Sequence, residues 1–432
     1  MTLPKGWVEA AIGEIAETKL GKMLDAAKNK GEPVQYLRNV NVRWGAFDLS
    51  DLLEMRVTAE EREALSVKDG DLFMCEGGEP GRCAVWRGGA RDLVFQKAIH
   101  RVRPLDAVDP DYLATHVAYL AQQDGLSQLF TGTTIKHLPQ VALQKIALPL
   151  PPAAEQRRIV AKLDALTARL TRARAELDRV PVLAKRVRQT ALDDEFADPA
   201  FGEPVTLSDL GQWSSGGTPK SSEASFYGGD IPWLRSGDLP DGLIDRHVMT
   251  ITDEGLHASP AKWVPAGAVL IAMYGATIGK LGVTTYPVTT NQAIACIVPS
   301  KRVTADWLFY LLLQKRPELV ALGQGGAQPN ISQQILKAIP TCLPVVEHQR
   351  AVSARLTSAI ARADRMEAEA ARARAMIDRL EAAILGRAFR GELVPQDPND
   401  EPASVLLDRI RAQRAAAPKP KRGRRKKVEA QG

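Results

Sequence analysis

The sequence is poor in the residues that build metal sites and disulfide frameworks. Its 432 residues contain four cysteines, Cys75, Cys83, Cys296 and Cys342, and no two of them form a CxxC pair. Its six histidines lack the short spacings that zinc ligands adopt. A reduced, cytosolic protein with no disulfide framework, no metal and no cofactor is therefore the simplest interpretation.

Long hydrophobic runs are also missing. The longest apolar segments, such as residues 266–273, are far shorter than the roughly 20 residues of a membrane-spanning helix. The opening residues, Met1–Trp7, contain no apolar signal-peptide core. These absences predict a cytoplasmic protein that does not associate with membranes.

Motifs of common catalytic sites are missing as well. The chain has no GxxxxGK[ST] phosphate-binding loop, no HExxH metalloprotease motif and no GxSxG nucleophile elbow. It also lacks an Asn-Pro-Pro-aromatic or Asp-Pro-Pro-aromatic stretch of the kind that amino-methyltransferases use on a flipped base. We therefore assign no catalytic residue and favour a non-catalytic binding protein. A stand-alone DNA-modifying enzyme and a coiled-coil scaffold with no DNA role remain the alternatives.

Positive charge is concentrated in two segments. Of 57 Lys or Arg and 51 Asp or Glu residues, the tail at residues 418–432 holds seven and one. The tail thus accounts for the whole net charge of +6, and the rest of the chain is neutral overall. Within that rest, residues 155–192 carry ten basic and four acidic side chains. A DNA partner would have to be attracted by such patches or by a partner subunit, not by overall charge.

A repeated helical pattern dominates what is present. Apolar or alanine residues recur at alternating spacings of four and three, which is the seam of a coiled coil. The first seam is Ile159, Leu163, Leu166, Leu170, Ala173, Leu177, Val180, Ala184, Val187 and Ala191; the second is Val352, Leu356, Ala359, Ala363, Met366, Ala370, Ala373, Ile377, Leu380 and Ile384. Each position of the second seam lies 193 residues after its counterpart, and the same offset aligns Gln156-Arg157 with Gln349-Arg350. The chain is therefore a tandem duplication in which each half ends in a long helix.

The two seams predict how the helices pack. Residues 155–192 would form a helix of about 57 Å, and its one-sided apolar stripe needs a partner in water. The second helix can return antiparallel to the first and bury both seams, with the globular halves at opposite ends and related by a pseudo-twofold axis. Pro181 lies inside the first helix and removes one backbone hydrogen bond, which predicts a kink or break there.

The globular halves read as mixed α/β domains of short strands and turns, so the fold class is α+β. A helix is expected at residues 112–122, a helix start near Ala153 after Pro151-Pro152, and an amphipathic stretch at residues 403–414. The predicted segments are domain 1 (1–152), long helix 1 (153–196), domain 2 (197–345), long helix 2 (346–392), a C-terminal segment (393–417) and a basic tail without fixed structure (418–432).

Several stretches of the sequence resemble one protein family. They are the opening Leu3-Pro4-Lys5-Gly6-Trp7, the stretch Ser215-Gly216-Gly217-Thr218-Pro219 followed by Ile231 to Asp238, the helix entry Leu148 to Pro152 with Glu155 to Val160, and the closing Ala388 to Pro395. In this order, on a duplicated frame, they resemble the specificity (S, or HsdS) subunits of type I restriction-modification enzymes. The resemblance covers residues 3–410. It departs at Thr18 to Lys22, which replace the Ser-Gly-Gly-Thr-Pro pattern, at Glu347-His348-Gln349, and at the basic tail.

The resemblance implies a DNA-reading subunit of a methyltransferase and endonuclease complex. Each mixed domain would be a target-recognition domain that reads one half of a bipartite, asymmetric site in double-stranded DNA. The paired helices would set the spacing of the half-sites and dock two methyltransferase (modification) subunits. A restriction subunit would join through that complex.

Polar and aromatic side chains in glycine-flanked loops are the candidates for contact with bases, since Arg and Lys match guanine, Asn matches adenine and Asp accepts from cytosine. They are Arg38, Asn39, Asn41, Arg43 and Trp44 in the first half and Lys220, Ser221, Trp233, Arg235, Ser236 and Asp238 in the second. Arg38 and Arg235 occur in both halves and can equally well brace the fold. The unshared Asn41, Arg43 and Trp44 are favoured for specificity.

Further candidates precede or lie on the helices. Thr133, Thr134 and Lys136 in the first half, and Gln328 and Asn330 in the second, are expected either to contact phosphates or to cap the following helix. For Arg172, Arg174, Arg179, Lys185, Arg186 and Arg188 the solvated flank of a coiled coil is favoured over a DNA or partner surface. The cluster Lys421–Lys427 either binds phosphates non-specifically or increases solubility.

Overall fold

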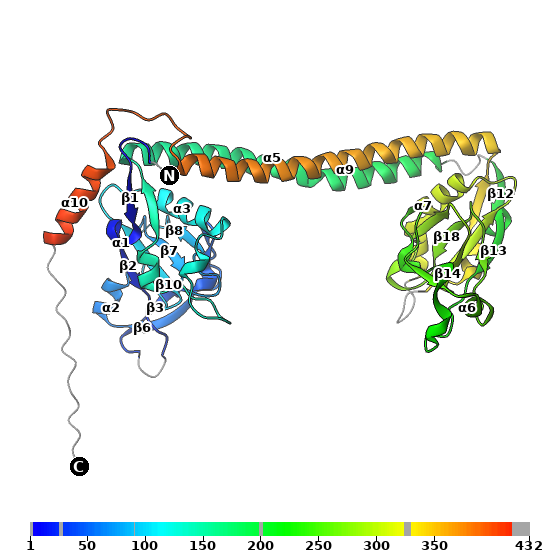
Figure 1. Ribbon diagram of the computed structural model, residues 1–432, viewed down its shortest axis with the longest axis horizontal. Helices are drawn as coiled ribbons and strands as arrows, with labels where there is room; N and C mark the ends of the chain where they lie inside the picture. Colours follow the sequence, from blue (N-terminus) through cyan, green and yellow to red (C-terminus); the bar gives the residue numbers. More distant parts are fainter. Residues whose placement is uncertain (1–2, 26–28, 90, 198–201, 324–329, 417–432) are drawn as a thin grey trace, which may run out of the picture. The chain divides into compact units, whose positions relative to one another are not determined.

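The computed structural model describes residues 3–25, 29–89, 91–197, 202–323 and 330–416. Its residues form two compact units, the first from residues 1–174 and 374–432 and the second from residues 175–373. Each unit combines one globular half of the chain with part of each long helix (Figure 1). The predicted basic tail and Gln328 lie outside the described residues.

The globular part of the first unit contains two small sheets. Its strands are β1 (Val8–Ala11), β2 (Ala16–Leu20), β3 (Glu32–Leu37), β4 (Val42–Arg43), β5 (Ala46–Phe47), β6 (Leu53–Val57), β7 (Leu72–Cys75), β8 (Cys83–Val85), β9 (Leu93–Phe95), β10 (Ile99–Pro104) and β11 (Ala147–Leu150). Its short helices are α1 (Ile12–Ile15), α2 (Ala59–Ala64), α3 (Pro110–Gln122) and α4 (Gln140–Gln144). The sheets have the orders β2-β10-β7-β8 and β6-β3-β9, and β1 pairs with β11 and β4 with β5.

The second unit repeats this topology. Its strands are β12 (Glu203–Thr206), β13 (Gly211–Ser215), β14 (Tyr227–Leu234), β15 (Gly242–Ile244), β16 (Met249–Ile251), β17 (Trp263–Val264), β18 (Val269–Ala272), β19 (Leu281–Thr284), β20 (Val288–Thr290), β21 (Ile294–Pro299) and β22 (Pro340–Leu343). Its short helices are α6 (Asp253–His257), α7 (Ala305–Leu322) and α8 (Gln333–Lys337). The sheet orders are β13-β21-β18-β19-β15 and β16-β14-β20-β17, and β12 pairs with β22. Apart from the added β15 and β17, each strand has a counterpart in the first unit, which confirms the tandem duplication.

The two long helices are α5 (Ala153–Glu195) and α9 (Val346–Phe389), and α5 begins at the predicted position. Within the first unit the Arg174 guanidinium pairs with Asp378 and Glu381 of α9, at 2.8 and 2.5 Å. Within the second unit Arg188 pairs with Asp364 and Glu367, both at 2.5 Å. Arg188 comes after Arg174 in α5, but its partners come before those of Arg174 in α9. The helices therefore pack antiparallel, as predicted. These two arginines connect the helices, whereas Arg179 pairs with Glu176 of its own helix.

The predicted break at Pro181 does not occur, because α5 continues through it as one helix of 43 residues. Proline removes only one backbone donor. In the next turns Ala184 is buried, and the ion pairs of Arg188 hold the helix on α9. The helix is thus not interrupted at Pro181.

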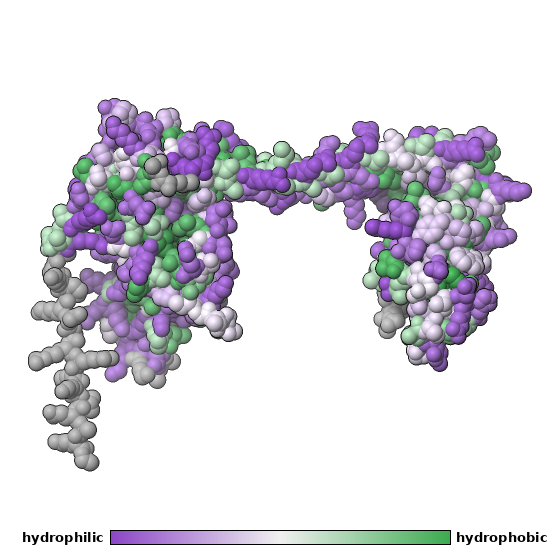
Figure 2. Space-filling view, in the orientation of Figure 1, coloured by the Kyte–Doolittle hydropathy of each residue, from purple (hydrophilic) through white to green (hydrophobic). Residues whose placement is uncertain are grey.

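The two helices bury their seams only in part. Ile159, Leu163, Val352 and Leu356 are buried because side chains of the globular parts cover them as well. Farther along, Val187, Met366 and Leu380 are 45–50% exposed, since a two-helix pair leaves the edges of each stripe uncovered. Figure 2 shows mainly hydrophilic side chains on the visible helix surface, with hydrophobic patches between them. The predicted pairing of the helices is therefore confirmed, but their packing buries only part of each seam.

The last described helix packs into the core of the first unit (Figure 1). Helix α10 (Ala403–Ala416) buries Ala403, Leu406, Leu407 and Ile410 in the core that also contains α1 and the last turn of α9. Val405, predicted on the same face, is 42% exposed. The guanidinium of Arg414 donates to the carbonyls of Gly13 and Ala16, which fixes the helix on the N-terminal segment.

His116 of α3 makes the first unit sensitive to acid. It is buried edge-on against Phe389, with ring centroids 4.7 Å apart, and this burial lowers its pKa from 6.5 to about 4. Because the unfolded chain binds this proton at higher pH, stability is lost as pH falls from about 6.5 to about 4, by about 3 kcal/mol in total. A His116→Phe variant should lose that component in denaturation measured from pH 7 to pH 4. Equal pH dependence in both proteins would contradict the assignment.

Among the described residues no helix has the length and apolar character needed to cross a membrane.

Candidate nucleic-acid interface

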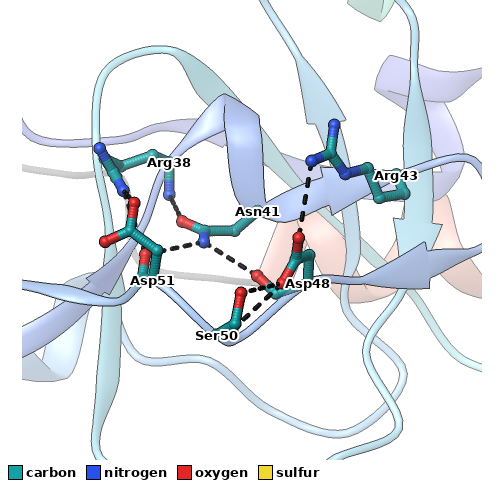
Figure 3. Close-up of polar contacts among 6 residues, drawn as sticks. All are labelled: Arg38, Asn41, Arg43, Asp48, Ser50 and Asp51. Atoms are coloured by element: carbon teal, nitrogen blue, oxygen red, sulfur yellow. Dashed lines mark hydrogen bonds and ion pairs between the residues drawn. The ribbon is translucent and has the colours of Figure 1, made fainter. Parts of the chain in front are cut away.

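The loop that follows β3 is organised around one asparagine (Figure 3). The side-chain oxygen of Asn41 accepts the backbone N–H of Arg38 at 2.8 Å, and its amide nitrogen donates to the carbonyls of Asp48 and Asp51 at 2.9 and 3.1 Å. Asn41 is 2% exposed. Both of its donors are committed to the backbone, so in this conformation Asn41 shapes the loop and offers no free donor to a base.

The two arginines of this loop pair with different carboxylates (Figure 3) and differ in exposure. Arg38 is held by the carboxylate of Asp51 at 2.6 Å, and its side chain is 21% exposed. Arg43 is 54% exposed and lies 3.6 Å from Asp48. Hydrogen bonds from Ser50 lower the pKa of Asp48, which keeps this carboxylate charged beside Arg43. Arg43 is therefore the more accessible of the two arginines.

The second unit contains the same turn. The backbone N–H of Arg235 donates to the Asp238 carboxylate at 2.9 Å across a 3-10 turn at Ser236–Asp238, as Arg38 does to Asn41 across Asn39–Asn41. Asn41 and Asp238 thus have one structural role although their identities differ. The Arg235 side chain is 50% exposed and reaches solvent more freely than that of Arg38.

Trp44 is held in place by Glu79 and Arg82, which are not among the predicted site residues. Its indole N–H donates to Glu79 at 2.7 Å, and the other Glu79 oxygen accepts from Arg82 at 2.8 Å. Arg82 also donates to the carbonyl of Asn39 at 2.9 Å. Trp44 stays 40% exposed, beside a cavity of about 400 Å³ that Phe130 also lines. The glycines around this turn between β7 and β8 mark it in the sequence, but not its contact with the Trp44 loop.

The Thr-rich loop before α4 joins this cluster. His137 forms a bridge with Gly77, whose carbonyl also accepts a 3.5 Å hydrogen bond from Asn39. Thr133, Thr134 and Lys136 are exposed. The capping alternative fails for the threonines, because Pro139 is the N-cap residue of α4 and no side chain caps it. In the first unit three loops therefore lie together: residues 38–45, 76–82 and 131–137.

The second unit brings together two of the equivalent loops. Asn330 bridges Tyr274, as His137 bridges Gly77 in the first unit. The N–H of Ile331 donates to the Met273 carbonyl at 2.9 Å, matching the 2.7 Å bond from Leu138 to Glu76. Asn330 and the 38%-exposed Tyr274 therefore lie side by side at the surface. Tyr274 was not predicted as a site residue.

The remaining candidates of the second unit divide by exposure. Trp233 is 4% exposed and donates its indole N–H to the Gly217 carbonyl at 3.0 Å, so it is a core residue in this structure. Lys220 and Ser221 are exposed, and Lys220 lies 3.2 Å from Glu223. Ser236 and Asp238 are half-buried in the 3-10 turn. No group of three or more His, Cys, Asp or Glu side chains suited to a metal ion occurs in the described part of the chain.

Comparison with known proteins connects this geometry to a family. The model of the type I restriction modification DNA specificity domain matches residues 4–178 and again residues 202–371. The EcoBI specificity subunit of Escherichia coli is 30% identical over 68% of this chain and 70% of that protein. The EcoKI specificity subunit of E. coli strain K12 is 24% identical over 98% of this chain and 99% of that protein.

A solved structure shares the fold. The HsdS subunit from Thermoanaerobacter tengcongensis aligns with a TM-score of 0.65 at 24% identity, covering 91% of this chain and 99% of the other. Two matches to one domain model, at the two halves of an internal repeat, account for most of the sequence. The chain therefore belongs to the family of type I restriction-modification DNA specificity subunits.

Proposed function

We propose that each globular half reads one half of a bipartite, asymmetric site in double-stranded DNA. The observation that carries this proposal is one loop framework, present twice, with different exposed side chains in each copy. Arg43, Trp44 and Lys136 are exposed in the first copy, and Arg235 and Asn330 in the second. A common framework with different surface chemistry suits two unlike half-sites. Thr133, Thr134, Lys220 and Ser221, also exposed, are proposed as phosphate or base contacts.

The proposal gives the buried candidates a supporting role. Asn41 and Trp233 would hold the recognition loops in shape. Arg38, Asn39, Ser236 and Asp238 would position the turn from which the exposed residues project. Glu79 and Arg82 join them, because they fix the indole of Trp44.

The long helices would set the distance between the half-sites and dock two methyltransferase subunits, through which a restriction subunit joins. The 43 residues of α5 correspond to a helix of about 65 Å. Successive major-groove contacts on one face of DNA are about 34–36 Å apart. A helical spacer of this length therefore suits two separated half-sites. The chain itself would carry no catalytic group and no cofactor.

Exchange of one recognition domain tests the proposal directly. Residues 1–150 would be replaced by the corresponding domain of a relative, together with residues 388–416, which pack into the same core. The methylated sequence, mapped across a genome, should change in one half and keep the other half unchanged. An unchanged sequence, or a change in both halves, would reject the assignment. Methylation or cleavage by the purified chain alone would favour the enzyme alternative, and absence of sequence-selective DNA binding with methyltransferase partners would favour the scaffold.

Single substitutions should affect one half-site each. Arg43→Ala is expected to weaken discrimination at the first half-site by about 1–3 kcal/mol, the range for a specific arginine contact to a base. Arg235→Ala is the matched variant and should act on the other half-site only. Binding of the assembled complex to DNA with single-base changes in each half measures both effects. If Arg43→Ala weakens binding to all sequences equally, Arg43 contacts a phosphate instead.

A further inference from the structure

The first unit contains a cavity of about 510 Å³ where the N-terminal segment, the start of α5 and the segment between α9 and α10 meet. Its wall includes Lys5, Trp7, Glu155, Asp397, Asp400 and Pro402. These residues come from three separate parts of the chain, so the cavity exists only when the C-terminal segment is packed in place. It belongs to neither group of recognition loops.

Glu155 is the unusual residue of this cavity. It is 1% exposed, and one of its oxygens accepts the indole N–H of Trp7 at 3.0 Å. The other oxygen, Oε1, is equally buried and accepts no hydrogen bond from any described residue. Burial, aided by the charge of Asp400, raises the pKa of this carboxyl above its ordinary value, although the Trp7 hydrogen bond and the charge of Arg158 oppose the shift. A buried carboxylate oxygen without a donor costs free energy, so the site is chemically incomplete.

The other charged groups nearby are largely committed elsewhere. Arg158 pairs with Asp400 at 2.7 Å, so its charge is shared with another carboxylate. Asp397 accepts hydrogen bonds from the backbone and side chain of Asn399. Glu155, Asp397 and Asp400 carry negative charge, and Lys5 and Arg158 carry positive charge. One net negative charge therefore remains around the cavity. One added cation would make the surroundings of Glu155 neutral and supply the missing donor.

The composition of the wall selects the class of ligand. An anion would be repelled by Glu155, Asp397 and Asp400. A metal ion is not favoured either, because the described residues contain no group of three or more His, Cys, Asp or Glu side chains that could hold one. Trp7 and Pro402 provide apolar surface for an aliphatic stem, as lysine and arginine side chains require when their charged ends reach a carboxylate.

We propose that this cavity, here called the Glu155 pocket, is a docking site for one lysine or arginine side chain of a partner protein. The docked cation donates to Oε1 of Glu155, and its stem lies against Trp7. The position of Glu155 in the second copy is taken by His348, so the carboxylate occurs once in the chain. The site would give an otherwise duplicated molecule one end that is chemically distinct for assembly.

Titration of the full-length chain with small probes tests the Glu155 pocket. The tryptophans would be labelled with 15N in the indole ring, and the Trp7 signal identified with a Trp7→Phe variant. N-acetyl-arginine amide is expected to shift the Trp7 indole signal saturably. The uncharged analogue N-acetyl-citrulline amide should bind at least tenfold more weakly. Equal responses to the two probes, or no saturable response to either, would overturn the proposal.

Variants locate the response. Glu155→Gln keeps the size of the side chain and should abolish the preference for arginine over citrulline, whereas His348→Gln, at the matched position of the second copy, should leave it unchanged. Lys5→Ala removes the cation already in the wall and should strengthen arginine binding two- to threefold, which keeps the proposal testable if Glu155→Gln does not fold. An arginine preference that persists in Glu155→Gln, or that Lys5→Ala weakens, would place binding elsewhere.

Discussion

Replacing Gln349 by leucine is expected to destabilise the second unit by roughly 3–5 kcal/mol, because the loss leaves several buried backbone groups without partners. The Gln349 side chain is fully buried. Its oxygen accepts the backbone N–H of Thr304 at 2.8 Å, and its amide donates to the carbonyls of Arg302 and Pro344, both at 2.8 Å. One side chain thus joins the start of α7, the turn before α7 and the entry of α9.

Gln156 performs the same task in the first unit. Its oxygen accepts the N–H of Asp109 at 2.8 Å, just before α3, and its amide donates to the carbonyl of Pro151 at 2.9 Å, just before α5. The glutamine of the repeated Gln-Arg pair therefore attaches each long helix to its globular part. Gln156→Leu should destabilise the first unit similarly but slightly less, because one fewer contact is lost.

The matched controls are Arg157→Leu and Arg350→Leu, which change the exposed neighbour of each glutamine. They should alter stability by less than about 0.5 kcal/mol. Hydrogen exchange of the backbone amides in each unit measures the effects separately, which a single unfolding curve of a two-unit protein cannot do. If the backbone amides exchange no faster in the glutamine variants than in the arginine controls, the glutamines do not attach the helices as proposed.

Gly216→Ala is the second large effect, with an expected loss of roughly 3–5 kcal/mol in the second unit, at or above the usual range for an overpacked site. A Cβ atom at this position would lie 1.8 Å from the carbonyl oxygen of Thr290. That carbonyl already accepts the N–H of Gly217 at 2.9 Å, so the added methyl group pushes against backbone that is itself hydrogen-bonded. No side-chain rotation relieves such a contact.

Gly21 is the counterpart in the first unit, where a Cβ atom would lie 2.2 Å from the Gln96 carbonyl. The following residue, Lys22, donates its N–H to the Phe95 carbonyl at 3.0 Å, as Gly217 does to Thr290. The first half departs from the Ser-Gly-Gly-Thr-Pro pattern, but it keeps the one glycine that is needed where two backbone segments approach this closely.

Gly237→Ala is the control for this prediction, since a Cβ atom there meets no atom of the described residues within 4 Å. Hydrogen exchange of the backbone amides in the second unit measures its free energy of unfolding. This free energy should decrease strongly in Gly216→Ala and change by no more than about 0.5 kcal/mol in Gly237→Ala. If both variants are equally stable, the backbone at Gly216 lies farther from the Thr290 carbonyl than the structure indicates.

The duplication, the two long helices, the helix start at Ala153 and the family resemblance could all be inferred from the sequence. Each depends on periodicity, on a constant offset or on local start signals, which are properties of residues near one another in the chain. The antiparallel direction also followed, because one helix leads out of the first half and the other follows the second.

The state of individual site residues could not be inferred in this way. Asn41 was favoured as a base reader because it is polar, unshared and lies in a loop. It is instead buried, because Asp48 and Asp51 turn their carbonyls toward its amide. Trp44 is presented at the surface because Glu79, 35 residues away, accepts its indole N–H. Exposure of a polar side chain depends on which distant segment covers it, and no local pattern contains that information.

By itself the sequence determined that the molecule has two similar halves, that each ends in a helix needing a partner, and that no familiar catalytic motif is present. Only the tertiary structure decided which side chains of the loops face outward, how Gln156 and Gln349 attach the helices, and that Glu155 is buried beside Trp7 across 148 positions of chain. The physical reason is that helix formation follows from short-range spacing. Burial and hydrogen-bond completion, in contrast, depend on segments that meet only after the chain has folded.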